Sequence, residues 1–201
     1  MSQDPSAATE DKVWVEIATP LGIDALRRFC DDLECLYRIN PYLDFTVWRN
    51  AGPDRYHVEF HNNSNDQDVV LDLTRRRESD LAFTVEYAQG IKAATRFALA
   101  ATGQGSKLTI TDDYSRLSLA ERAQRLNEVD KSLTAWGQGV FDYLRHLKRW
   151  GWFPPWRWYM RRVWTPMRPM SRRVTWMVIL VDVAFMALFL FVMLIYWVEF
   201  G

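Results

Sequence analysis

The sequence predicts an α+β domain followed by a single membrane-spanning helix, and three observations support that class. The first is a series of short runs in which apolar and polar residues alternate between turn residues, as in antiparallel strands. The second is a long run with apolar residues at steps of three and four, as in an amphipathic helix. The third is an apolar run near the end of the 201-residue chain. We therefore expect a soluble domain attached to a membrane.

The soluble part opens with a strand and continues into short helices. Lys12–Thr19 alternates apolar with polar positions, which predicts a half-buried strand. In residues 23–39 the apolar positions recur at helical steps, and Asn40-Pro41 ends the pattern because a residue before proline avoids helical dihedral angles. Cys30 and Cys35 fall in this helical stretch, and we expect both to be small, free thiols, buried or half-buried.

Six further strand-like runs follow, and residues that favour turns separate each run from the next. Short strands joined by such turns predict an antiparallel meander. The runs are 44–50, 55–62, 68–75, 81–87, 91–101 and 107–114.

The last soluble element is expected to be the longest helix of the domain. Ser118 and Glu121 form a capping-box pattern, and apolar residues then repeat at helical steps as far as Lys148. Gly137 and Gly139 lie within this helix, where each costs about 1 kcal/mol relative to alanine. Either the sheet or a ligand is therefore expected to approach the helix closely there.

The apolar run Val174–Val198 contains one charged residue, Asp182. A helix of that length extends about 37 Å, which is enough to cross a hydrocarbon core of about 30 Å. Residues 150–173 combine tryptophans, arginines and prolines, and aromatic and basic residues are enriched at the water–lipid boundary. We therefore predict a disordered lead-in (1–11), a soluble domain (12–149), an interfacial segment (150–173) and a transmembrane helix (174–198).

Charge is distributed unevenly, although the whole chain is formally neutral. Residues 145–173 hold nine basic residues and no acidic one, whereas residues 1–144 carry a net charge of −7. An acidic soluble domain argues against a nucleic-acid partner. Basic residues on one side of the span predict, by the positive-inside rule, a single-pass protein with its N-terminal domain in the cytoplasm.

The order of these elements resembles the helix-grip fold of the START / Bet v 1-like superfamily (SRPBCC), which includes polyketide cyclase/dehydrase-like members. The likeness covers about residues 12–148 and rests on element order and on the fragment Asp31…Leu36…Ile39-Asn40-Pro41. It implies a curved antiparallel sheet around a long C-terminal helix, with a hydrophobic cavity between them. Because such members are common in bacteria, it also implies a bacterial inner membrane for this chain.

Apolar residues predominate on the faces of the strands and of the last helix that would point inward. Such residues either close up as a core or line a cavity for an apolar ligand, and the sequence leaves both possibilities open. The predicted lining consists of Tyr56, Val58, Phe60, Leu71, Leu73, Phe83, Val85, Phe97, Leu99, Ile110, Trp136 and Val140.

The sequence shows no catalytic constellation, metal-ligand pattern or cofactor motif. His57, Glu59 and His61 alternate on one strand, so the two histidines lie about 13 Å apart and are expected on a polar outer face. Asp112 falls on an inward face, and we expect a plain strand-end carboxylate rather than part of a cavity mouth. Arg75-Arg76-Arg77 is expected to be a solvated strand end, with docking of an acidic partner or headgroup as the alternative.

Asp182 is the strongest single indication of a specific contact. A carboxylate inside a bilayer costs about 2.5–3.5 kcal/mol unless it is protonated or paired. Met186 and Phe189 share its helix face, so we expect this face to meet another membrane protein, with a lone neutral acid in lipid as the alternative. Membrane lipids are expected to contact Trp156, Trp158, Arg161, Arg162, Arg172 and Arg173.

Three functions are compatible with these features. The first is a membrane-tethered protein that holds or presents an apolar molecule, such as a lipid or isoprenoid quinone, at the cytoplasmic membrane surface. The second is an accessory or assembly subunit of a membrane protein complex, with a closed core. The third, a cyclase/dehydrase-type enzyme, is the weakest because the inward faces offer no acid–base pair.

Overall fold

The computed structural model describes residues 12–117 and 119–200, without the side-chain surroundings of residues 119–131 and 200. The predicted lead-in and Ser118 of the capping box lie outside the described residues. The chain divides into two compact units, Met1–Pro166 and Met167–Gly201.

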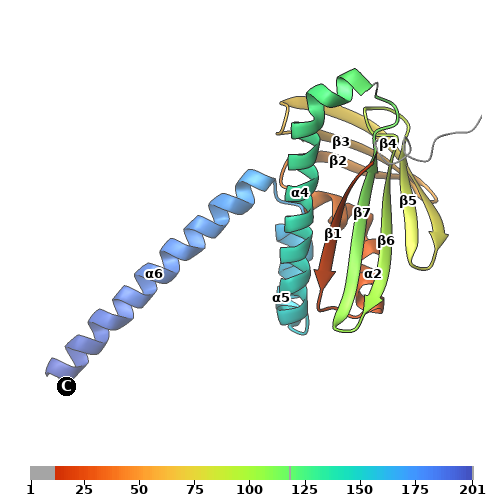
Figure 1. The fold of residues 1–201 in the computed structure, drawn as a ribbon. Helices are drawn as coiled ribbons and strands as arrows, with labels where there is room; N and C mark the ends of the chain where they lie inside the picture. The colour runs from red at the N-terminus through yellow and green to blue at the C-terminus, as the bar shows by residue number, and fades with distance from the viewer. Residues whose placement is uncertain (1–11, 118, 201) are drawn as a thin grey trace, which may run out of the picture. The chain divides into compact units, whose positions relative to one another are not determined.

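The first unit contains a seven-stranded, wholly antiparallel sheet (Figure 1). Its strands are β1 (Lys12–Thr19), β2 (Leu43–Gly52), β3 (Arg55–Asn62), β4 (Gln67–Ser79), β5 (Ala82–Tyr87), β6 (Ala94–Thr102) and β7 (Gly105–Asp113). Their spatial order is β1-β7-β6-β5-β4-β3-β2, so β2 to β7 form the expected meander. Strand β1 crosses over to pair with β7, with Lys12 opposite Asp113 and Thr19 opposite Ser106.

The helices of the first unit are α2 (Ile23–Asp31), α3 (Leu33–Arg38), α4 (Leu119–Trp150) and α5 (Pro154–Tyr159), followed by a π-helical turn, η1 (Met160–Trp164). Helix α3 ends just before Asn40-Pro41, as predicted. Helix α4 runs along the sheet and packs on β1 (Figure 1). Helix α5 begins at Pro154. Proline suits the first position of a helix, because the backbone N–H that it lacks would have no partner within the helix there.

Several strand boundaries differ from the prediction by a few residues, and β4 continues to Ser79 instead of ending at residue 75. Two of these differences have a clear local cause. Strand β6 begins at Ala94 rather than at residue 91, because Gly90 adopts a φ of 94° and the chain turns there into a loop. Leu81 precedes β5 and is 39% exposed, since a register shift between Arg77 and Ser79 ends the regular pairing of β4 with β5. The loop of residues 91–93 is important for the site described below.

Trp136 of α4 lies at the centre of the core. Its indole Nε1–H donates a hydrogen bond of 2.9 Å to the carbonyl oxygen of Leu36 in α3. Its ring lies 5.2 Å from the ring of Tyr37 and 5.9 Å from that of Phe97 in β6, measured between centroids. One side chain therefore joins the long helix to α3 and to the sheet.

The two glycines within α4 are explained by close approach of the protein itself. A Cβ added to Gly137 would lie 2.8 Å from Cγ2 of Val15 in β1. A Cβ added to Gly139 would lie 3.1 Å from Cγ2 of Ile39. Of the two expected possibilities, the first strand and the residue after α3, rather than a ligand, make the close contact.

The two cysteines behave as predicted, because Cys30 and Cys35 are both free and buried. Burial raises the pKa of the Cys30 thiol, and the neighbouring Asp31 carboxylate adds to this effect. Cys30 is therefore a packed, unreactive thiol at neutral pH.

The second unit contains α6 (Pro169–Phe200), which begins before the apolar run. Its residues Pro169–Glu199 are long and apolar enough to cross a membrane. Asp182, Met186 and Phe189 follow one another at steps of four and three along this helix, and all three are exposed.

We predict that Gly137→Ala destabilises the protein by about 1 kcal/mol. Alanine gains about 1 kcal/mol of helix propensity, but overpacking against the stiff Val15 side chain costs about 1–3 kcal/mol. In a Val15→Ala background the clash is removed, so the same substitution should stabilise. Urea unfolding in mild detergent, followed by near-ultraviolet circular dichroism, measures both changes. Equal effects in the two backgrounds would contradict the close contact.

Candidate functional site

A cluster of polar side chains lies inside the otherwise apolar interior. Asp112 of β7 is 0% exposed, and its carboxylate is paired with the ammonium group of Lys92. The same carboxylate accepts hydrogen bonds from the Thr95 hydroxyl and, at 3.3 Å, from the Tyr114 hydroxyl. The expectation that Asp112 is a plain strand-end carboxylate is therefore wrong, because burial has been compensated by three donors.

Two tyrosines extend the cluster from the sheet to α3. The hydroxyl groups of Tyr87 and Thr95 lie 2.8 Å apart. The hydroxyl groups of Tyr37 and Tyr87 lie 2.6 Å apart. We call Tyr37, Tyr87, Lys92, Thr95, Asp112 and Tyr114 the Lys92 cluster. Its members come from α3, the end of β5, the following loop, β6, β7 and the residue just after β7.

The loop that carries Lys92 is held in place by the backbone and by Arg116. The φ of 94° at Gly90 turns the chain, and the Arg116 guanidinium donates to the carbonyl oxygens of Tyr87 and Lys92. The Lys92 ammonium then lies 5.6 Å from the ring centroid of Tyr114 and 6.0 Å from that of Trp136. Both rings stabilise the positive charge through cation–π attraction.

The surroundings keep Lys92 charged and the tyrosines neutral. Burial is the largest effect on the pKa of Lys92 and lowers it, but the Asp112 carboxylate and the tyrosine oxygens outweigh burial and raise the pKa overall. Burial raises the pKa of Tyr37, Tyr87 and Tyr114. At neutral pH the cluster therefore consists of hydrogen-bond donors around the Asp112 carboxylate, which is already paired. This arrangement suits recognition of a carbonyl or hydroxyl group better than it suits proton abstraction.

The predicted lining residues belong to, or pack against, the same hydrophobic core as Tyr37 and Tyr87 of this cluster. Phe83 and Phe97 stack with ring centroids 4.8 Å apart, and Phe97 meets Trp136 edge to face. Val58, Leu71, Leu73, Val85, Leu99, Ile110 and Val140 are buried as well. Tyr56 and Phe60 are only partly buried and pack at the β2–β3 end. These side chains are in contact with one another in this structure.

The outer face of the sheet is polar and paired, as predicted. The imidazole rings of His57 and His61 each bind one carboxylate of β4, Asp72 at 2.8 Å and Asp68 at 2.9 Å. These hydrogen bonds raise the pKa of both histidines.

The arginine run at the end of β4 is also paired within the chain. Arg75, Arg76 and Arg77 bind Asp54, Glu86 and Asp31 respectively. This pairing favours the structural interpretation of Arg75-Arg76-Arg77 over a docking site, because each guanidinium already has a carboxylate partner.

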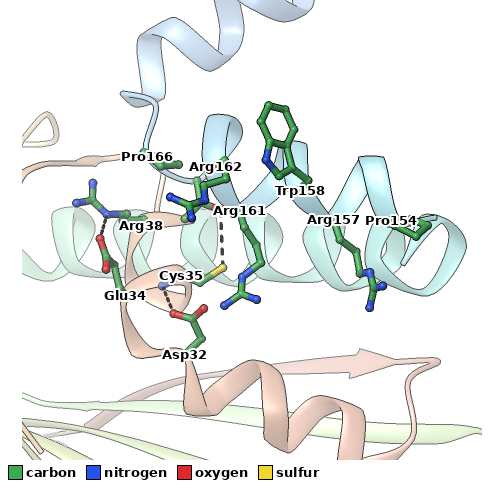
Figure 2. Close-up of a pocket in the computed structure, with 11 residues that line it drawn as sticks. Asp32, Glu34, Cys35, Arg38, Pro154, Arg157, Trp158, Arg161, Arg162 and Pro166 are labelled. Carbon is green, nitrogen blue, oxygen red and sulfur yellow. Dashed lines mark hydrogen bonds and ion pairs between the residues drawn. The ribbon is translucent and has the colours of Figure 1, made fainter. Parts of the chain in front are cut away.

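A second feature is a groove of about 770 Å³ between α3 and the α5–η1 segment (Figure 2). Trp158, Arg161 and Arg162, which were predicted to contact lipids, line this groove. Trp156 instead packs against the core. Arg172 and Arg173 lie in the first turns of α6, in the second unit.

The Lys92 cluster was missed by reasoning from sequence, apart from Asp112. A signal existed, because Thr95 and Asp112 occupy inward positions next to apolar inward residues, Phe97 in β6 and Ile110 in β7. A polar residue at such a position is informative, since it must find a buried partner. Lys92 carried no such signal, because it lies in a loop.

Comparisons with known proteins extend only to structure. No protein-family model matches the chain, and no curated protein matches it. A protein from Thermus thermophilus matches with a TM-score of 0.53 at 13% identity, over 66% of this chain and 96% of that one. A START superfamily protein from Mycobacterium smegmatis matches with a TM-score of 0.51 at 12% identity, over 66% of this chain and 94% of that one.

A third match is the di-domain ARO/CYC protein StfQ of the steffimycin biosynthetic pathway. Its TM-score is 0.54 at 10% identity, over 73% of this chain and 55% of that one. At these identities the likeness shows the fold alone, and it confirms the fold that the element order predicted.

We predict that Lys92→Met destabilises the protein more than Asp112→Asn does. Lys92→Met leaves a fully buried carboxylate without its counter-ion, which costs about 3–5 kcal/mol. In Asp112→Asn the Lys92 side chain, 26% exposed, can turn toward water, so we expect a loss of about 1–2 kcal/mol. The double variant should resemble Asp112→Asn alone. Urea unfolding tests this, and additive losses would show that the two groups are not coupled.

Proposed function

We propose that this chain, whose soluble unit has the START-like helix-grip fold, is a membrane-tethered binding protein for an apolar ligand with one polar end. The observation that carries the proposal is the Lys92 cluster within an apolar interior. A few convergent polar groups in apolar surroundings are typical of a ligand site, in which they select and orient the molecule.

The chemistry of the cluster indicates the class of ligand. A buried ion pair contributes little net stability to a fold, because apolar residues of similar volume often stabilise it as well or better. The presence of such a pair beside three neutral tyrosines therefore supports a recognition role. A carbonyl or hydroxyl group could replace one of the internal hydrogen bonds, and a lipid or an isoprenoid quinone offers such a group on an apolar body.

Tethering is supported by α6 and by the charge next to it. The apolar run that starts at Val174 is preceded by a basic segment, residues 145–173, without an acidic residue. We propose that this segment faces a bacterial cytoplasm and that the N-terminal unit lies on the same side. A binding domain held there meets its apolar ligand at the membrane surface, with little diffusion through water.

Native mass spectrometry of the full chain in mild detergent tests the proposed binding. We expect a stoichiometric apolar compound on the native protein, and its loss from the folded Lys92→Met/Asp112→Asn variant. A matched control removes the exposed pair of Lys107 and Glu16, which lie 2.8 Å apart on the outer face, and should keep the compound. A native protein without any bound compound, even after incubation with total lipid extract, would contradict the proposal.

A closed-core accessory subunit is the second candidate, and the ring packing favours it. Phe83, Phe97, Tyr37 and Trp136 contact one another in the space where a ligand would lie. In this alternative the specific contact is made within the membrane, by the helix face that carries Asp182.

We predict that Asp182→Ala releases a membrane-protein partner, because a donor on that partner would stabilise a carboxylate that otherwise costs about 2.5–3.5 kcal/mol in lipid. Leu180→Ala, on the opposite face of α6, is the matched control. The measurement is quantitative co-purification in mild detergent together with membrane abundance. Unchanged co-purification of Asp182→Ala relative to Leu180→Ala would refute the partner face.

A further inference from the structure

The groove between α3 and the α5–η1 segment carries positive charge that the chain does not fully neutralise. Of its arginines, Arg38 is paired with Glu34 at 2.7 Å. Arg157, Arg161 and Arg162 are exposed and form no ion pair with any residue that the structure describes. The groove therefore presents three guanidinium groups that are available to an anion.

The two carboxylates in the groove do not serve these arginines. The Glu34 carboxylate binds Arg38, and the Asp32 carboxylate accepts the backbone N–H of Cys35 at 3.1 Å as the N-cap of α3. Four arginines and two carboxylates leave a formal net charge of +2 on the lining. A phosphate group, with one or two negative charges, matches this excess.

The arginines are positioned by a segment that is packed against the domain. In η1 the backbone N–H of Thr165 donates to the carbonyl oxygen of Met160 at 2.9 Å, five residues back. Met160 and Thr165 are buried, Thr165 lies 3.9 Å from the sulfur of Cys35, and the Trp164 ring lies 5.9 Å from that of Tyr143 in α4. A π-turn of this kind often occurs at a functional site.

Two of the three arginine side chains extend into the space between α3 and η1. Figure 2 shows Arg161 extending toward α3 beside Cys35, and Arg162 extending toward Arg38. Arg157 precedes Arg161 by one helical turn and also lines the groove. Planar guanidinium groups bind phosphate oxygens in pairs, so several of them around one groove form a phosphate site rather than a diffuse patch.

We propose that this groove binds the phosphate group of an anionic phospholipid headgroup. The proposal rests on the tethering part of the proposed function. Pro166 lines the groove, and only Met167 and Arg168 separate it from Pro169, where α6 begins. Trp158, another lining residue, is 63% exposed, as is usual for an aromatic side chain at the lipid–water boundary.

The binding test uses the full chain in mild detergent and dihexanoyl phosphatidylglycerol as the probe. Isothermal titration should detect binding to the native protein and about 100-fold weaker binding to Arg157→Gln/Arg161→Gln, because each of the two lost charge-assisted hydrogen bonds weakens binding about tenfold. The matched control, Arg145→Gln/Arg149→Gln, removes the same charge from α4 outside the groove lining and should change the affinity less than about threefold. Equal losses in the two variants would show diffuse attraction and overturn the site.

Two further probes distinguish the possible sources of the phosphate. Dihexanoyl phosphatidylcholine should bind much more weakly than the anionic lipid, since its headgroup carries no net charge. Inorganic phosphate should also bind more weakly, because it lacks the glycerol backbone. Equal affinity for inorganic phosphate would assign the groove to free phosphate and overturn the headgroup, and an absence of all binding would overturn the site.

Vesicle flotation separates failure of this site from failure of tethering. The Arg157→Gln/Arg161→Gln variant should still float with phosphatidylglycerol vesicles, because α6 anchors it. If the native chain does not float, tethering fails while the detergent titration still decides the groove. Far-ultraviolet circular dichroism should show unchanged folding of both double variants, since Arg145, Arg149, Arg157 and Arg161 are all exposed.

Discussion

The hydrogen bond from Trp136 to the carbonyl oxygen of Leu36 is the interaction on which the first unit depends. Trp136 is 2% exposed, and its N–H would otherwise be buried without a partner. The same ring supports Phe97 of β6 and lies beneath the Lys92 ammonium. The long helix, the sheet and the polar cluster are therefore positioned by a single side chain, so any movement of α4 must disturb the cluster as well.

The two polar features of the unit differ in how far their charges are satisfied. In the interior, Asp112 has three donors, and Lys92 has a counter-ion and two aromatic rings. In the groove, Arg157, Arg161 and Arg162 lack carboxylate partners among the described residues. A buried network whose hydrogen bonds are all made favours one conformation. Exposed guanidinium groups without a carboxylate partner instead form strong charge-assisted hydrogen bonds when an anion binds. Under the two proposals made above, the Lys92 cluster selects the apolar ligand and the groove positions the chain on anionic headgroups.

Local patterns predicted the elements well, and long-range contacts explain what they missed. Strands β1 and β3 have the predicted bounds, because alternation along one strand determines which side chains are buried. The start of β6 was wrong, because a positive φ at Gly90 and the pairing of Lys92 with Asp112 decide that loop. The groove depends on Cys35 meeting Thr165, residues 130 positions apart, and no periodicity contains that information.

The pairing of the first strand with the last has a consequence for how the chain folds during synthesis. Strand β1 leaves the ribosome before the other six described strands, yet its partner in the sheet, β7, ends at Asp113. Thr19 and Ser106 must be brought together before the hydrogen bonds of this pairing can form. The entropy cost of closing so long a loop slows folding. Until then the apolar side chains of β1 remain uncovered, and α4 cannot dock against Val15. The N-terminal strand therefore stays without its strand partner until the end of the sheet has been made.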